Sequence, residues 1–175
     1  MSSFRGDRRL ALAGLLALAG CGFTPALAPG GPAAGLDAGV EVDPPENRNE
    51  FDLVRQLERR LGRSSGPRYR LSYQLDTRKD GVGVTPRQEL IRYNLIGQLR
   101  YALHDLRSGE IVTSGRVESF TGYSVGAVDT FAVPPSTNAT IATLAAERDA
   151  YARLMVILAD LVVSRLIATS ADWAG

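Results

Sequence analysis

The apolar stretch from Leu154 to Val163 constrains the fold more than any other part of the chain. Asp160 is its only polar residue. It lies within a segment, from about residue 138 to residue 169, in which apolar residues recur every three or four positions, and this predicts one helix of ~30 residues and ~45 Å. A run of ten residues is too short to span a bilayer, which takes ~20. The helix therefore has to be covered by protein on more than one side.

Two apolar strips run along this predicted helix. The main strip consists of Ile141, Leu144, Ala145, Tyr151, Ala152, Met155, Leu158, Val162 and Leu166. A second strip, formed by Leu154, Ile157 and Leu161, repeats at i, i+3 and i+7. The sequence leaves two alternatives for what packs against this second strip. One is another helix of the same chain, and the other is a partner subunit, for which these three residues are candidate contacts.

A short strand and a helix are predicted near the start of the folded region. Residues 39–43 alternate in polarity and stop at two prolines, which is typical of an edge strand. Asn47 or Asn49 can cap the helix that follows. Its apolar positions, spaced by three and four, are Phe51, Val54, Leu57 and Leu61. Gly62 comes directly after them, where helices commonly end.

Three further strands are predicted at 68–76, 91–104 and 111–118, because polarity alternates along each. A loop at 80–83 and a turn at 106–109 would join them. In the last strand, Ile111, Thr113, Gly115 and Val117 are expected on one face and Val112, Ser114, Arg116 and Glu118 on the other.

The order strand, helix, three strands, helix predicts an α+β fold. Two helices would pack on one face of a four-stranded, mixed, mostly antiparallel sheet, as a two-layer sandwich. Because a helix connects the first strand to the second, these two strands are expected to be parallel.

The beginning of the chain has the pattern of a secreted lipoprotein. Three arginines precede an uncharged apolar run, and the small residues Ala19 and Gly20 precede Cys21. This predicts a signal peptide over residues 1–20 and a lipid-bearing cysteine at position 21, which makes the membrane a binding partner. Residues 21–37 are rich in proline and glycine and are expected to be a tether, so that residues 38–175 form a single domain. Since Gly22, and not aspartate, follows the cysteine, the expected location is the periplasmic face of the outer membrane.

Composition excludes several classes of chemistry. With one cysteine, Cys21, and one histidine, His104, the chain can form no internal disulfide and no Cys/His zinc site. No carboxylate cluster or serine motif accompanies His104, so we expect no metal, no cofactor and no enzyme. Removal of residues 1–20 leaves 17 basic and 18 acidic residues, a balance that gives no reason to expect a nucleic-acid partner.

Basic residues gather on the polar side of the three predicted strands. They are Arg68, Arg70, Arg92, Arg100 and Arg116. Side chains on one face of neighbouring strands lie ~5 Å apart, so these arginines can form a cationic stripe that contacts a polyanion or an acidic partner surface. The alternative is an ordinary solvated sheet face.

Several short motifs, in order, carry a family resemblance. They are Cys21-Gly22-Phe23-Thr24-Pro25, Arg92-Tyr93-Asn94-Leu95, Ser108-Gly109-Glu110, Thr121-Gly122-Tyr123-Ser124 and the helical run from Ala145 to Ala150. Together they resemble the LptE family of lipopolysaccharide-assembly lipoproteins, in its alphaproteobacterial form. The resemblance implies a non-catalytic subunit that plugs the LptD β-barrel of the outer membrane and helps to place lipopolysaccharide in the outer leaflet, with direct lipopolysaccharide contact through basic residues.

Two other functions remain open at the level of sequence. One is an auxiliary lipoprotein of a lipid-transport ABC system, which would bind lipid or a periplasmic partner. The other is an envelope hydrolase that uses the single histidine.

Overall fold

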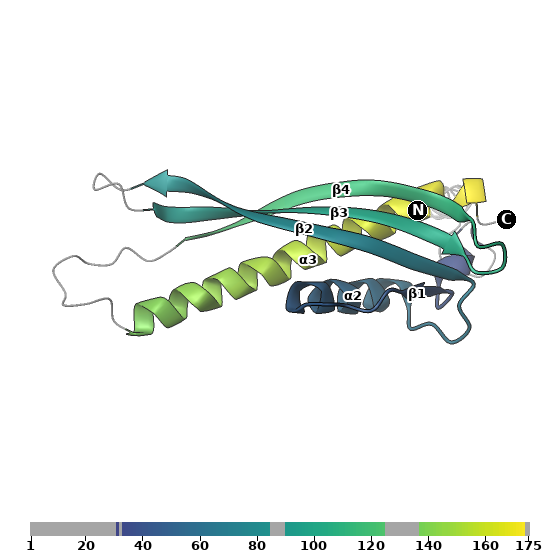
Figure 1. Ribbon diagram of the computed structural model, residues 1–175, viewed down its shortest axis with the longest axis horizontal. Coiled ribbons are helices and arrows are strands. Elements are labelled where there is room, and N and C mark those ends of the chain that lie inside the picture. The colour runs from purple at the N-terminus through teal and green to yellow at the C-terminus, as the bar shows by residue number, and fades with distance from the viewer. Residues whose placement is uncertain (1–30, 32, 85–89, 125–136, 174–175) are drawn as a thin grey trace, which may run out of the picture.

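The α+β fold expected from the sequence is confirmed. A computed structural model describes residue 31 and residues 33–84, 90–124 and 137–173. Its elements are the short 3₁₀ helix η1 (Ala34–Leu36), β1 (Val40–Val42), α2 (Arg48–Leu61), β2 (Tyr69–Val84), β3 (Leu90–Asp105), β4 (Ile111–Ser124) and α3 (Thr137–Trp173). Both longer helices lie on the same side of one four-stranded sheet (Figure 1).

The strand order is β1-β2-β3-β4, and the sheet is mixed and open. As expected, β1 is parallel to β2, with Val40 opposite Tyr69 and Val42 opposite Leu71. The β2–β3 and β3–β4 pairs are antiparallel. Because β1 has only three residues, it pairs with only the first three residues of β2. Within the described ranges, the rest of that edge and the far edge of β4 have no neighbouring strand.

Capping residues set the limits of α2. The Asn47 side chain accepts a hydrogen bond of 3.0 Å from the Glu50 backbone N–H, and Gly62 ends the helix with φ +77°, a conformation in which glycine is strongly preferred. The buried residues of α2 are Leu53, Val54, Leu57 and Leu61. Phe51, expected in this strip, is instead 56% exposed, because Leu53 takes the inward position.

The predicted ends of the strands are wrong in two places. Asp80–Gly83, expected as a hairpin loop, belongs to β2 and pairs with β3 through an irregular register at Gly81 and Gly83. The last strand continues to Ser124. In both cases a long antiparallel neighbour supplies backbone hydrogen bonds that local glycine content does not reveal.

Ile111 also lies on the unexpected face. The β3–β4 register shifts between Leu103, which is opposite Thr113, and His104, which is opposite Ile111. A β-bulge of this kind inserts one extra residue, here Val112, and reverses the facing of the residue before it. Ile111 is accordingly 57% exposed, while Val112 packs against the core.

The core forms where α3 meets the sheet at Gly97. A Cβ atom at Gly97 would lie 2.8 Å from Leu158 Cδ1 and 3.1 Å from Leu154 Cδ2, and both leucines are fully buried. Leu154 is therefore a core residue, and its prediction as a partner contact is wrong. Leucine side chains reach the sheet here because β3 carries no side chain at that point.

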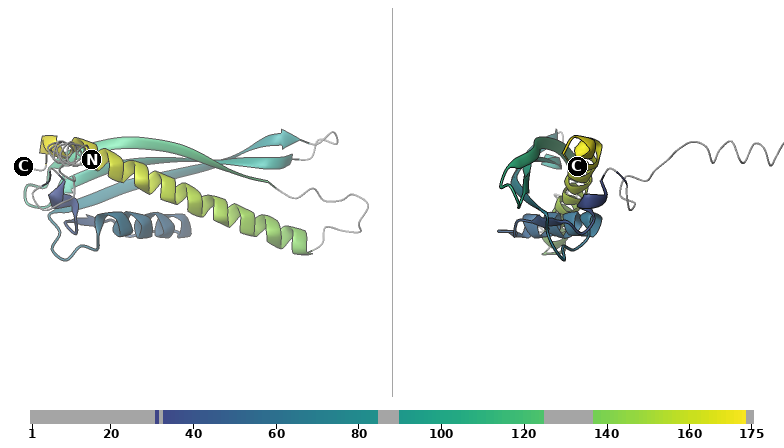
Figure 2. Two further views of the ribbon diagram at one scale, coloured as in Figure 1. Left: turned by 180° about the vertical axis from the view of Figure 1, so that it is seen from behind. Right: turned by 90° about the vertical axis from the view of Figure 1, so that its right-hand side faces the viewer.

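The main strip of α3 is buried only along part of the helix. Met155, Leu158, Val162 and Leu166 are fully buried, whereas Ile141 and Leu144 are 58% and 49% exposed. The N-terminal part of α3 is exposed because it extends beyond the start of α2, as Figures 1 and 2 show.

Among the described helices, α3 is long and apolar enough over Ile141–Trp173 to cross a membrane by length and composition alone. It packs against α2 and the sheet instead, and Arg60 Nε of α2 lies 2.9 Å from Asp160 Oδ1 of α3. Of the second strip, Leu154 packs on Gly97 of β3 and Ile157 and Leu161 stay 37% exposed, so α2 does not bury that strip.

The end of the predicted tether belongs to the folded unit. Ala33 and Leu36 are fully buried within the core, and the Ala38 N–H donates to the Leu61 carbonyl at 2.7 Å. The expected boundary at residue 38 is therefore too late, because Leu36 finds apolar neighbours that composition does not reveal.

We expect Gly97→Ala to lower the free energy of unfolding by about 1–3 kcal/mol, since overpacking a filled core has this effect. Chemical denaturation measures the change. Gly66→Ala is the control, because a Cβ there meets nothing within 4 Å. Equal stability of the two variants would contradict the packing described at Gly97.

Candidate functional site

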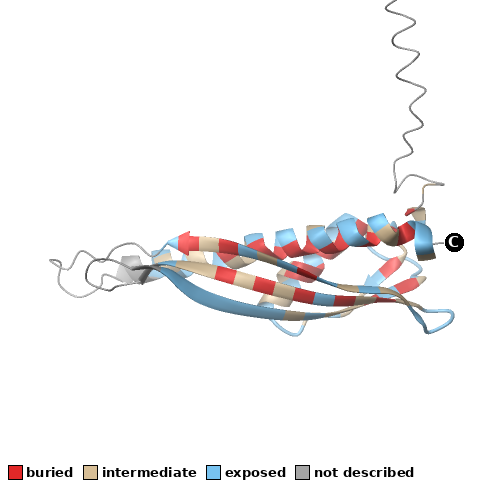
Figure 3. Ribbon diagram, turned by 90° about the horizontal axis from the view of Figure 1, so that it is seen from above, coloured by how far each residue is buried: buried red, intermediate tan, exposed pale blue. Residues whose placement is uncertain are grey.

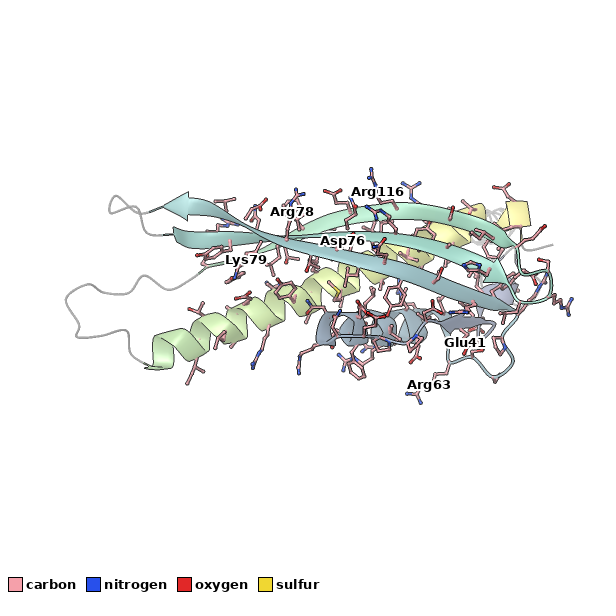
Figure 4. The ribbon with its side chains drawn as sticks, viewed as in Figure 1. Glu41, Arg63, Asp76, Arg78, Lys79 and Arg116 are labelled. Atoms are coloured by element: carbon pink, nitrogen blue, oxygen red, sulfur yellow. The ribbon has the colours of Figure 1, made fainter. Side chains whose placement is uncertain are left out.

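The outer face of the sheet, opposite the helices, carries the polar surface of the domain. Arg100 on β3 is directly opposite Arg116 on β4. Arg100 donates from Nη1 to Gln74 Oε1 at 3.0 Å and from Nη2 to Gln98 Oε1 at 3.3 Å. The side-chain amides of Gln74 and Gln98 hold the Arg100 guanidinium on the surface beside Arg116. Figure 4 shows Arg116 pointing away from the helices.

The other three predicted arginines do not join this pair. Arg70 Nε donates to Asp43 Oδ1 at 2.6 Å, and this carboxylate raises the pKa of Arg70. Arg68 lies 5.0 Å above the Tyr69 ring centre and 3.7 Å from Asp105. Arg92 is eight residues from Arg100 along β3, or ~26 Å. The five residues therefore form no continuous stripe.

Further residues, missed in the sequence, lie beside the arginine pair. Arg78 is opposite Ile96, which is opposite Phe120, and Phe120 is 65% exposed. Asp76 and Glu118 separate this row from the arginine pair. Polarity stops alternating after Leu75, so no sequence pattern marked Arg78, and the expected loop at 80–83 ended the predicted strand before it.

Two shallow depressions mark this surface. One, of about 380 Å³, is lined by residues that include Arg78, Ile96 and Arg100. The other, of about 450 Å³, is lined by residues that include Ile96 and Phe120. We define the outer-face patch as Arg78, Ile96, Arg100, Arg116 and Phe120. It combines guanidinium groups, which bind phosphate and carboxylate, with the exposed Phe120 and the half-buried Ile96. The acids Asp76 and Glu118 also line the depressions.

A larger cleft of about 830 Å³ lies between the start of α2 and the middle of α3. Its lining includes Phe51, Tyr151 and Arg148, and also the acids Asp52 and Asp149. Both acids are paired with arginines of their own helices. Within the described ranges, no group of three or more His, Cys, Asp or Glu side chains is placed to hold a metal ion.

His104 contacts a serine on the outer face. Its Nε2 lies 3.0 Å from Ser72 Oγ, and the same hydroxyl lies 3.2 Å from the Ala102 carbonyl, to which it can also donate. A nucleophilic serine donates its proton to a histidine that a third group, commonly a carboxylate, orients. Here the cross-strand neighbour of His104 is the cation Arg70. The geometry is that of a surface hydrogen bond.

The remaining predicted residues differ in exposure. Ile157 and Leu161 are each 37% exposed, so this part of the second strip stays accessible. Leu154 lies in the core. Cys21 and the predicted signal peptide fall outside the described residues.

Comparisons with known proteins give one family and a shared fold. A family model described as "LptE: Lipopolysaccharide-assembly" matches residues 38–166. No curated protein sequence matches the chain. A lipoprotein from Caulobacter crescentus is similar in structure, with a TM-score of 0.62 and 22% identity over 80% of this chain and 96% of that one. A minor lipoprotein from Acinetobacter baumannii has a TM-score of 0.50 and 14% identity, over 74% and 89% of the two chains.

We expect no labelling of Ser72 by a fluorophosphonate probe, which reacts with activated serines, because the cross-strand neighbour of His104 is the cation Arg70 and not a carboxylate that would orient the histidine as a base. In-gel fluorescence of the purified chain measures the reaction. Ser72→Ala and His104→Ala serve as controls. Labelling that both substitutions abolish would contradict this interpretation and revive a hydrolase.

Proposed function

The chain belongs to the LptE family of lipopolysaccharide-assembly lipoproteins, and we propose that it is the lipid-anchored subunit of an outer-membrane lipopolysaccharide translocon. In this role it plugs an LptD-like β-barrel, assists its assembly and helps to place lipopolysaccharide in the outer leaflet. The match over residues 38–166 is the observation that carries the proposal, because it includes α2, all four strands of the sheet and α3 as far as Leu166.

The proposed anchor is Cys21. Eleven residues separate it from Ala33, where the buried part of the chain begins. An extended segment of this length reaches ~40 Å. Such a tether lets the domain stand away from the inner leaflet of the outer membrane while several acyl chains hold it there.

The outer face of the sheet suits a polar, water-filled barrel lumen. Its described side chains include Gln74, Asp76, Gln98, Arg100 and Glu118, which remain hydrated or hydrogen-bonded in such a lumen. We propose that the arginine pair of the outer-face patch contacts phosphate groups of lipopolysaccharide or acidic residues of the barrel, since a guanidinium binds both in bidentate fashion.

Purification of the chain from detergent-solubilised outer membrane is expected to recover a large β-barrel protein in equimolar amount. Cys21→Ser should release the chain into the soluble periplasmic fraction and lower this recovery, because the acyl anchor is lost. Mass spectrometry and quantitative immunoblotting measure both effects. Recovery of ABC-transporter subunits without a barrel would favour the auxiliary lipoprotein instead.

Reversal of the arginine pair, in Arg100→Glu/Arg116→Glu, is expected to weaken binding to lipopolysaccharide or to the purified barrel by about tenfold or more. The estimate follows from charge-assisted hydrogen bonds of about 1.5 kcal/mol or more each. Surface-immobilised binding measurements give the affinity. The matched control is Arg63→Glu/Arg107→Glu, whose arginines are exposed but lie off this face. Equal affinity of both variants for both partners would exclude a role for the pair.

A further inference from the structure

The helical cover of α3 is incomplete. Residues of α3 that follow one another at spacings of three and four lie along one side of the helix. On the side that packs against α2 and the sheet, they are Ile141, Leu144, Arg148, Tyr151, Met155, Leu158, Val162 and Leu166. The last four are fully buried, whereas Ile141 and Leu144 are 58% and 49% exposed. In Figure 3 the buried residues of α3 accordingly gather toward its C-terminal end.

A cleft opens where α2 begins. It has a volume of about 830 Å³ and lies between α2 and α3, with Arg148 and Tyr151 in its lining. The lining also includes Phe51 of α2, which is 56% exposed. Because Arg148 and Tyr151 belong both to the cleft and to the uncovered part of the strip, the two features form one continuous surface. We call this surface the helix groove, and its residues are Arg48, Phe51, Ile141, Leu144, Arg148 and Tyr151.

Three large apolar side chains of the helix groove are exposed without a role in the core. They are Phe51, Ile141 and Leu144. Contiguous exposed apolar side chains bordered by polar ones are typical of a protein–protein contact. The same strip of α3 is buried further along, where α2 lies over it, and lacks an equivalent cover here within the described ranges. The groove therefore continues a helix-packing surface that the domain itself leaves unfinished.

The helix groove also carries positive charge. The lining acids Asp52 and Asp149 pair with arginines of their own helices, whereas no ion pair within the described ranges involves Arg48 or Arg148. Glu46 is the only other acid in the lining. Arg48 is the first residue of α2, a position at which the helix dipole disfavours a cation. Its charge therefore suits an anionic group of a partner better than it suits the stability of the helix.

We propose that the helix groove binds an acidic, amphipathic segment of the partner protein, which extends over the N-terminal part of α3 the cover that α2 provides further along. Apolar side chains of the segment pack on Phe51, Ile141 and Leu144, and its carboxylates pair with Arg48 and Arg148. Along α3 the groove extends for ~15 Å, which fits about ten residues of helix or about five of strand. The inference rests on the proposed function, because the barrel protein supplies the segment.

The arrangement of charged and apolar positions favours a polypeptide over lipopolysaccharide as the occupant. Arg148 lies between Leu144 and Tyr151 in the strip. A guanidinium packed against acyl chains loses its hydration without compensation, whereas an amphipathic segment can place a carboxylate there. The groove also lies on the helix side of the sheet (Figure 1), opposite the outer-face patch for which phosphate contact is proposed.

Site-specific photo-cross-linking in cells identifies the occupant. The photoreactive residue p-benzoylphenylalanine replaces Phe51 or Leu144 in the full-length lipidated chain, and mass spectrometry identifies the cross-linked peptide. We expect both positions to cross-link to an acidic segment of the barrel protein. The control position is Ile111 at the start of β4, which is 57% exposed but lies outside the groove, and it should not cross-link to that segment.

Apolar substitutions test the contribution of the strip. Ile141→Gln/Leu144→Gln should weaken binding to the purified barrel protein about tenfold or more, because two side chains lose their burial against the partner. The matched control is Leu106→Gln/Ile111→Gln, whose side chains are 45% and 57% exposed, and it should leave the affinity unchanged. Circular dichroism should show the same thermal midpoint for both variants and the wild type, since none of these side chains belongs to the core.

Charge reversal tests the arginines. Arg48→Glu/Arg148→Glu should also weaken binding to the barrel protein about tenfold or more, because two attractions become repulsions. Arg63→Glu/Arg107→Glu, outside the cleft lining, is the control. Binding of Arg48→Glu/Arg148→Glu to purified lipopolysaccharide should be unchanged, which separates the groove from the arginine pair of the outer-face patch.

The outcomes distinguish this inference from the proposed function. If the wild-type chain recovers no barrel protein, the proposed function fails and the inference fails with it. If the barrel protein is recovered but the groove variants bind it as tightly as their controls, the inference alone is overturned. Cross-links from position 144 to lipopolysaccharide, or to residues 125–136 of the same chain, would also overturn it, since the occupant would then be a lipid or a segment of this chain.

Discussion

The contact between α3 and Gly97 is the constraint on which the rest of the domain depends. Leu154 and Leu158 occupy the space where β3 lacks a side chain, and this close approach fixes the depth and direction of α3 against the sheet. α2 then packs beside α3, with Arg60 and Asp160 paired between the two helices. Because the helices cover one face of the sheet, the other face stays in contact with water and carries the charged patch.

The two faces of the domain differ in what they contribute because one is buried by the helices and the other is exposed to water. Burying the leucines of α3 stabilises the fold through the removal of apolar surface from water. The outer face contributes little to stability, since its ion pairs and amide contacts are exposed. Its residues are therefore free to serve binding, and Arg100, Arg116 and Phe120 lie there. Within the described ranges, no strand lies beyond β4.

Element types were predictable because their signals are local. The capping residues Asn47 and Gly62 predicted the limits of α2, and alternating polarity predicted the three long strands. The helix between the first two strands predicted that β1 and β2 are parallel. The extent of β2 past Asp76 was not predictable, because pairing with β3 stabilises a segment whose glycine residues alone favour a loop. The bulge at Val112 and the burial of Leu36 and Leu154 depend in the same way on partners distant in sequence. For the site, alternation placed the arginines on one face but gave no distances along the strands.

The sequence by itself determined the types and order of the elements, most of the inward-facing residues and the family resemblance, because periodicity and motif spacing are properties of the chain. Only the tertiary structure decided which of those residues meet. It united Arg100 with Arg116 and separated Arg70, Arg68 and Arg92 from them, since strand register sets cross-strand neighbours. It also left β4 as an edge. Register and edges arise from pairing between distant segments, and a pattern read along one strand does not contain them.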